Sequence, residues 1–207
     1  MTHGPISVVL GILLVVSIPA QEQRPAQKAQ SLPTEEKKLS LKETTDFLKE
    51  KIVANAFYEH TSDAADGKVI IDFRVEDVQI DGCALTIKTA ETSSFKPSEP
   101  PFNGPRGTTN DLDKIELTDL DAKRVTVTEF QGSGFVLKMG TIDDRKSVHH
   151  HFEKKDYRST GEMTTQFVAD ESLPTIHILF TDKDMANRIA NAFVHAIGLC
   201  STKKEPF

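Results

Sequence analysis

The chain has 207 residues, and its 25 Lys or Arg against 31 Asp or Glu give a formal net charge of −6. This length suits one ordinary domain with extensions, and an acidic chain has no general attraction for nucleic acid or anionic membranes. The lack of Trp and the presence of only 2 Tyr disfavour base-stacking and sugar-binding platforms, whereas 12 Phe favour core packing. We therefore expect a protein or small-molecule partner, with no nucleic acid and no membrane contact beyond an export signal.

The N-terminal region is typical of an exported protein. An uncharged apolar run at residues 6–18 is followed by Pro19-Ala20-Gln21, and this run is shorter than the roughly 20 residues that cross a bilayer. It predicts a signal peptide over 1–20, a disordered Gln-, Pro- and Lys-rich linker over 21–38 and a domain over 39–207. The expected location is periplasmic or extracellular. An uncleaved membrane anchor is the alternative, because residues 1–5 carry no Lys or Arg.

Helical signals lie at both ends of the predicted domain. Ser40 and Glu43 form a capping box, and the buried stripe that follows predicts a helix over about 40–55 (Leu41, Thr45, Leu48 and Ile52). Thr181 or Asp182 is the expected N-cap of a second helix over 183–199. Its apolar stripe has helical spacing (Met185, Ile189, Phe193, Ala196, Ile197 and Cys200). Because few apolar residues follow this helix in the sequence, we interpret it as a lid over the strands that precede it.

A polar turn is expected at 61–67. The segment from 68 to 180 then changes to period-two patterning, which indicates strands. Two strands are expected around 69–75 and 83–87, separated by an acidic turn that holds Glu76, Asp77 and Asp81, after which residues 91–110 form a long Pro- and Gly-rich break. Strand patterns then resume in six segments (115–117, 124–130, 135–139, 148–152, 163–168 and 175–180). The predicted fold class is α+β, mainly β: an antiparallel barrel or sandwich of seven to eight strands, with an N-terminal helix and a C-terminal capping helix.

This order of strands before one amphipathic helix resembles the pleckstrin-homology-like superfold. Four motifs are similar to those of a set of uncharacterised exported bacterial proteins, over residues 40–207: Ser40-Leu41-Lys42-Glu43-Thr44-Thr45, Asp81-Gly82-Cys83-x-Leu85, Ile115-x-Leu117-x-Asp119-Leu120-Asp121, and Ala186-x-Arg188-x-Ala190-x-Ala192-Phe193-x-His195-Ala196-Ile197-x-Leu199-Cys200. The resemblance implies a binding scaffold without an assigned activity. Phosphoinositide-binding members carry basic residues between the first two strands, where this chain has Glu76, Asp77 and Asp81, so lipid head-group binding is not implied.

Cys83 and Cys200 are the only cysteines, and an even count in an exported chain favours one disulfide between them. Their spacing excludes a CxxC redox or zinc motif, and two buried free thiols are the alternative. The bond would tie an early strand to the far end of the last helix.

Candidate metal ligands have structural interpretations that we prefer. On a strand, His149 and His151 share one face and His150 points away, so one ion would need a third ligand such as His177. The pairs Asp111-x-Asp113 and Asp119-x-Asp121 could suggest calcium, but no glycine-centred loop accompanies them, and turn residues are the preferred interpretation. We expect neither a metal nor another cofactor.

Other candidates are also weak. The segment Gly132-Ser133-Gly134 lacks the surroundings of a nucleophile elbow and favours a hairpin, and His195 is interpreted as a helix-surface or satisfied core histidine. The Phe-containing segment 95–107 is either a recognition loop or disordered. The sequence shows no acid–base or nucleophile constellation, so the predicted function is a non-enzymatic exported binding or interaction module. The alternative is a small hydrolase or ligand-binding barrel whose site is assembled from dispersed residues.

Overall fold

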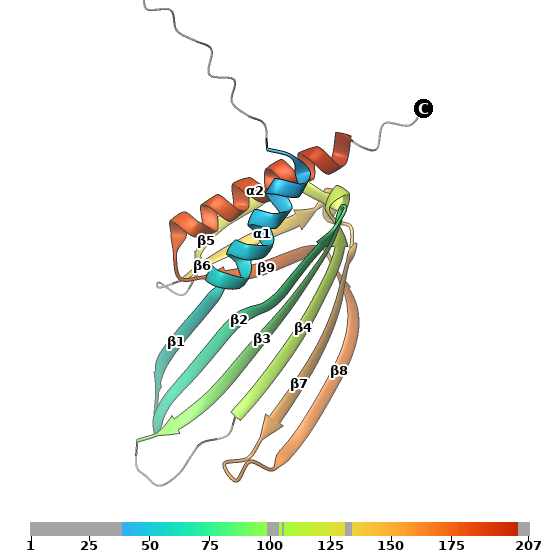
Figure 1. Cartoon of the computed structure of the whole chain (residues 1–207). Coiled ribbons are helices and arrows are strands. Elements are labelled where there is room, and N and C mark those ends of the chain that lie inside the picture. The colour runs from blue at the N-terminus through green and yellow to red at the C-terminus, as the bar shows by residue number, and fades with distance from the viewer. Residues whose placement is uncertain (1–38, 99–103, 105, 131–133, 203–207) are drawn as a thin grey trace, which may run out of the picture. The chain divides into compact units, whose positions relative to one another are not determined.

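The computed structural model describes residues 39–98, 104, 106–130 and 134–202. In these residues the main chain forms nine strands, two helices and two short 3-10 turns (Figure 1). Their order is α1 (Leu41–Asn55), β1 (Phe57–Ala64), β2 (Gly67–Asp81), β3 (Ala84–Pro97), β4 (Arg106–Glu116), η1 (Leu117–Asp119), β5 (Leu120–Phe130), β6 (Gly134–Thr141), η2 (Ile142–Asp144), β7 (Val148–Tyr157), β8 (Met163–Leu173), β9 (Thr175–Phe180) and α2 (Lys183–Thr202). The predicted signal peptide and linker lie outside the described residues.

The strands form two open antiparallel sheets, and the predicted closed barrel is wrong. The large sheet has the order β1-β2-β3-β4-β7-β8, and the small sheet has the order β5-β6-β9. The chain leaves the large sheet after β4, builds the β5–β6 hairpin, and returns for β7 and β8. Alternating apolar residues determine which face of a strand is buried, but they do not specify which edges pair, so sequence could not decide between closure and two layers.

Both terminal helices form as predicted. Ser40 and Glu43 make the reciprocal capping box, and α1 covers the expected 40–55 region. Asp182 is the N-cap of α2, because the Met185 N–H donates to its Oδ1 at 2.7 Å; α2 continues to Thr202, slightly beyond the predicted end. The helix packs on β5, β6 and α1, so it covers the small sheet and is not a lid over a barrel.

Three strand predictions are wrong. The expected acidic turn lies inside β2, where a bulge between Val75 and Asp77 interrupts the alternation; Glu76 stays in the strand and binds Lys88 Nζ at 2.8 Å. The expected break at 91–110 is mostly strand, because β3 and β4 pair from Ala84 opposite Glu116 to Ser94 opposite Arg106. The expected polar turn at 61–67 is largely strand β1 and was mistaken because its residues are polar.

One hydrophobic core fills the space between the large sheet, the small sheet and the helices. Its members come from α1, α2 and seven of the strands, and the largest fully buried side chains in it are Phe180, Phe193, Leu48, Ile52, Leu85, Ile87, Leu117, Leu120, Leu137, Met139 and Ile176. Gly134 opens β6 where the ring of Tyr58 lies against its Cα, so that a Cβ there would clash with that ring. Neither described helix is long and apolar enough to span a membrane.

Cys83 and Cys200 form the predicted disulfide, with Cα atoms 5.9 Å apart. Cys83 lies in the turn between β2 and β3 rather than within a strand, directly after Gly82 at φ +60°. The bond attaches the last turns of α2 to the tip of the β2–β3 hairpin. Disulfides persist in oxidising compartments, so the bond is compatible with an exported protein.

Candidate functional site

The inner face of the large sheet changes character along its strands. Where the small sheet and α2 cover it, the inward side chains are apolar and buried (Ile80, Leu85, Ile115 and Val148). We call this part the covered half. Further along the same strands, the inward positions include polar side chains; Thr89 is paired with Asp111, and Asp113 with His150. Figure 1 shows these strands continuing well past the small sheet, and we call this part the uncovered half.

A pocket of about 480 Å³ lies at the boundary between the two halves. One wall is the inner face of β2, β3, β4, β7 and β8. The other consists of Phe130 at the end of β5 and of the face of β6 and β9 that is opposite the buried residues Leu137 and Ile178. The lining combines apolar and titratable side chains: Phe73, Phe130, Val136, Leu173, Leu179, Thr89, Thr175, Glu91, Asp111, Asp113, Lys138, His150 and His177. Eight strands, β2 to β9, therefore contribute to one site.

Three carboxyl groups converge on this pocket from two neighbouring strands. Burial raises the pKa of Glu91, Asp111 and Asp113 above their ordinary values. The charge of Asp111 raises the pKa of both Glu91 and Asp113 further, since like charges nearby disfavour ionisation. Asp111 accepts a 3.3 Å hydrogen bond from the Thr89 hydroxyl, and Glu91 has no hydrogen-bond or ion-pair partner among the described residues. The nearby charge of Lys154 lowers the pKa of Glu91, and that of His150 lowers the pKa of both aspartates, so the negative charge of this wall is compensated only in part.

His150 partly compensates the most buried carboxylate. Its Nδ1 lies 2.7 Å from Oδ1 of Asp113, whose residue is only 9% exposed. Its Nε2 lies 4.0 Å from Oε1 of Glu171 on β8. The imidazole is thus held between carboxylates of the two strands that flank β7.

The opposite wall of the pocket contains Lys138 on β6 and His177 on β9, which lie opposite each other in the small sheet. Partial burial lowers the pKa of His177, and the nearby charge of Lys138 lowers it further. Lys138 is the only Lys or Arg among the described lining residues, so three carboxyl groups face one ammonium group. The pocket as a whole favours positive charge in a ligand.

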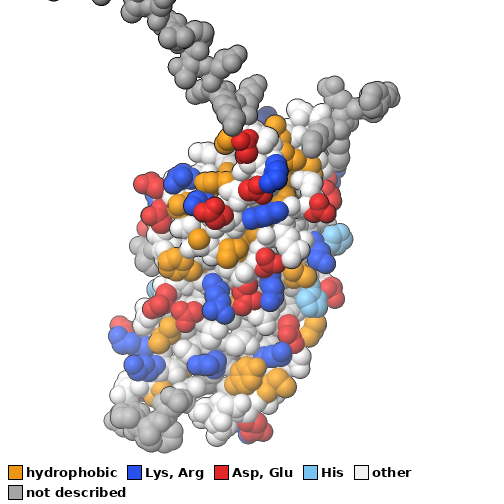
Figure 2. Space-filling model, in the orientation of Figure 1, with side chains coloured by type: hydrophobic (Ala, Val, Ile, Leu, Met, Phe, Trp, Pro, Cys, Tyr) orange, Lys and Arg blue, Asp and Glu red, His pale blue; other side chains and the backbone are white. Residues whose placement is uncertain are grey.

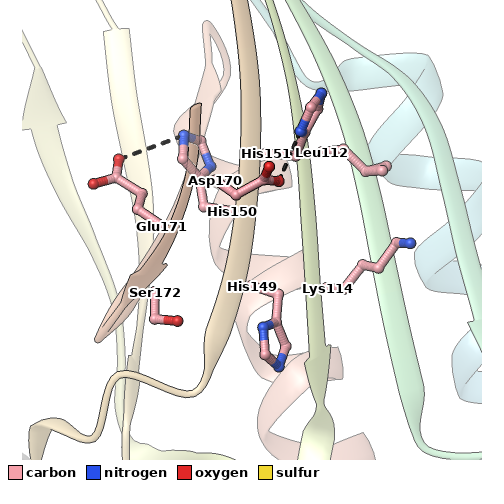
Figure 3. A pocket seen from close by; sticks show the side chains of 8 residues that line it. All are labelled: Leu112, Lys114, His149, His150, His151, Asp170, Glu171 and Ser172. Carbon is pink, nitrogen blue, oxygen red and sulfur yellow. Dashed lines mark hydrogen bonds and ion pairs between the residues drawn. The ribbon is translucent and has the colours of Figure 1, made fainter. Parts of the chain in front are cut away.

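The side chains of the three adjacent histidines of β7 alternate between the two faces of the sheet, as predicted for a strand. In Figure 3, His150 points toward Glu171 on one side of β7, whereas His151 bonds Asp170 on the other at 2.8 Å. His149 and His151 line a smaller hollow of about 250 Å³ on the outer face. Among the described residues, no three His, Cys, Asp or Glu side chains are arranged to hold a metal ion, and His177 lies in the other pocket.

The predicted roles of the aspartates need correction. Asp111 and Asp113 are not turn residues: they lie within β4 and point into the pocket, as their shared register on one face dictates. Of the second pair, Asp119 lies in the short turn η1, whereas Asp121 lies in β5, where its Oδ1 accepts from the Lys123 N–H at 2.9 Å. The period of two between Asp111 and Asp113 was the available signal, but the break assumed over 91–110 concealed it.

The remaining candidates have structural positions. His195 Nδ1 lies 2.9 Å from the Thr44 hydroxyl and links α2 to α1, so this histidine has a partner, as interpreted from sequence. Gly134 begins β6, and residues 131–133 lie outside the described chain. Phe95 belongs to β3 and not to a loop.

The face of the molecule in Figure 2 shows acidic and basic side chains intermixed over the strands, with hydrophobic side chains in small groups. No protein-family model, curated protein or solved structure matches the chain. The fold and site together define a two-sheet antiparallel protein with an acidic, apolar-walled pocket. The resemblance to exported bacterial proteins stays a prediction.

Proposed function

We propose that this protein is a non-enzymatic, exported binding module that takes a small cationic amphiphile into the pocket between its two sheets. The supporting observation is the convergence of Glu91, Asp111 and Asp113 on an apolar-walled pocket with only one facing ammonium group. A ligand that carries an amine or quaternary nitrogen would neutralise the like-charged carboxylates. Its hydrocarbon part would contact the apolar lining, of which Phe73, Phe130 and Leu179 are members.

The charge preference separates this proposal from general hydrophobic binding. An apolar pocket without electrostatic selectivity would bind ligands with the same alkyl chain at similar affinity, whatever the charge of their head group. The carboxylates instead favour a cation and disfavour an anion, because an ion held in a partly desolvated site interacts more strongly than in water. Protonation of the same carboxylates would remove this preference, so binding of the cation should weaken at acid pH.

Calorimetric titration with n-octylammonium, 1-octanol and n-octyl sulfate tests the proposal. We expect affinity to decrease in that order at neutral pH. The double variant Glu91→Gln/Asp111→Asn should bind n-octylammonium at least tenfold more weakly than the unmodified chain and should bind 1-octanol with unchanged affinity. Asp72→Asn is the matched control, because Asp72 is exposed on β2 and its register places it on the outer face. Equal affinity for the three probes, or an equal loss in the control, would refute the proposal.

A hydrolase is the second candidate, and the Asp113–His150 pair favours it. A carboxylate that orients an imidazole can support general-base catalysis. Among the described lining residues, however, no hydroxyl or thiol is hydrogen-bonded to His150, and the Thr89 hydroxyl donates to Asp111. Turnover of an activated ester such as p-nitrophenyl octanoate, abolished in His150→Asn, would favour the hydrolase. Binding without turnover favours the module.

A further inference from the structure

The strand β8 forms one edge of the large sheet and is paired only with β7 among the described strands. An edge strand presents unpaired backbone N–H and C=O groups along its free side, and the group that satisfies such a ladder is another β-strand. The edge is long, because β8 has 11 residues.

The first seven of the 11 residues of β8 lack the usual protection of an edge, whereas Asp170 and Glu171 follow toward its end. Its first seven residues, Met163-Thr164-Thr165-Gln166-Phe167-Val168-Ala169, carry no charge and no Pro, and three large hydrophobic side chains on it are about half exposed (Met163 48%, Phe167 54% and Val168 50%). Charged side chains and Pro are the common devices that prevent edge pairing. The opposite edge, β1, has no uncharged stretch of this length, since Glu59 and Asp63 divide its eight residues.

A row of aromatic rings on the inner face ends at this edge. The rings of His150 and Phe152 have centroids 5.5 Å apart, and those of Phe152 and Phe167 are 5.4 Å apart. Phe167 is the last member and has no ring beyond it among the described residues. A strand added to β8 that carried an aromatic side chain at the matching position would continue the row.

We propose that β8 pairs in antiparallel register with β8 of a second copy of this chain, joining two large sheets across a two-fold axis. With Phe167 opposite its symmetry mate, Met163 lies opposite Glu171 and Thr164 opposite Asp170, so no like charges meet. With Gln166 at the axis, Glu162 would lie opposite Asp170, which is unfavourable. The uncharged segment and the ring of Phe167 make the edge complementary to itself, which favours a second copy over an unrelated partner.

The expected association is weak and concentration-dependent. Pairing through one edge buries less surface than the roughly 1,200–2,000 Å² of a stable interface. The dimer should therefore form toward the millimolar range and dissociate on dilution.

Sedimentation equilibrium of the full chain from micromolar to millimolar concentration, combined with hydrogen exchange, tests this proposal. The average mass should rise toward that of a dimer, and amides of 163–169 should gain protection with concentration. Phe167→Lys places two ammonium groups across the axis and should weaken dimerisation at least tenfold.

The matched control is Phe57→Lys, which changes another Phe that is 50% exposed, on the opposite edge strand. It should leave the mass distribution unchanged, and circular dichroism should show that both variants are folded. A monomeric mass at all concentrations would overturn the proposal. So would equal weakening by the two variants, or a dimer in which the β8 amides gain no protection.

Discussion

The covered and uncovered halves of the large sheet are built from the same strands but differ in what their inward side chains meet. In β4, Ile115 lies in the covered half and is 5% exposed, whereas Asp111, four residues earlier on the same face, points into the pocket. The core ends where the second layer ends, and the strands continue without a cover. The strands of the large sheet are longer than the second layer that covers them. Their additional length forms the site, because its inner face is rigid but is not filled by the hydrophobic core.

The two halves also differ in energetic role. Burial of Ile115 and its neighbours stabilises the fold, roughly in proportion to the apolar area removed from water. Partial burial of three carboxyl groups is a cost, as their raised pKa values indicate. Residues retained against such a cost are candidates for function.

The largest expected effect concerns the attachment of α2 over the covered half. The disulfide has a sequence separation of 117 residues, for which the chain-entropy model gives about 4–5 kcal/mol of stabilisation. Cys200→Ser or a reductant should therefore remove a large part of the roughly 5–15 kcal/mol of a typical domain. Thermal denaturation measures this. Cys83→Ser should cost the same, and an unchanged melting temperature in either variant would contradict the account.

A pair of substitutions on β4 compares the halves directly. Ile115→Ala in the covered half should lower the free energy of unfolding by about 2–5 kcal/mol, because it leaves a cavity in a packed core. Thr109 lies on the same face of β4 in the uncovered half. Thr109→Ala should therefore change the free energy of unfolding by no more than about 0.5 kcal/mol. Urea denaturation of both variants measures the difference. Similar losses would mean that the uncovered half is also part of the core.

The smallest expected effect comes from the pocket carboxylates. Their folded pKa values lie above the unfolded ones, so the folded chain binds more protons between the two, and the free energy of unfolding rises as pH falls through the folded values. Asp111→Asn removes an ionisable group and should stabilise the chain at neutral pH by no more than about 1 kcal/mol, since the pocket is open to solvent. Melting temperatures across pH measure this gain, which should vanish below about pH 4. A variant that is less stable at neutral pH would contradict the assignment.

Local signals in the sequence predicted much of the fold. The capping box at Ser40, the stripe of α2 and the alternation around Ile176 each depend on short-range geometry, and each element formed where expected. The disulfide was also predictable, because only two cysteines exist. The division into two sheets was not, since strand pairing is a long-range property that alternation does not encode.

The site was harder to predict than the fold. Its residues come from eight strands. The polar alternation in β3 and β4 suggests a break, because Pro97, Pro100, Pro101 and Pro105 lie nearby in the sequence. The spacing of Asp111 and Asp113 fits a turn as well as one face of a strand. Their convergence with Glu91 and His150 depends on strand register, which only the structure provides.

Carboxyl-carbon NMR titration tests the central claim most directly, because it observes Glu91, Asp111 and Asp113 individually. In the free protein, the account predicts that all three titrate above the ordinary range of Asp and Glu, whereas Glu76, which pairs with Lys88, titrates below it. Addition of n-octylammonium should lower the pKa of the three pocket groups and leave that of Glu76 unchanged. Ordinary pKa values in the free protein, or no response to the cation, would contradict the account.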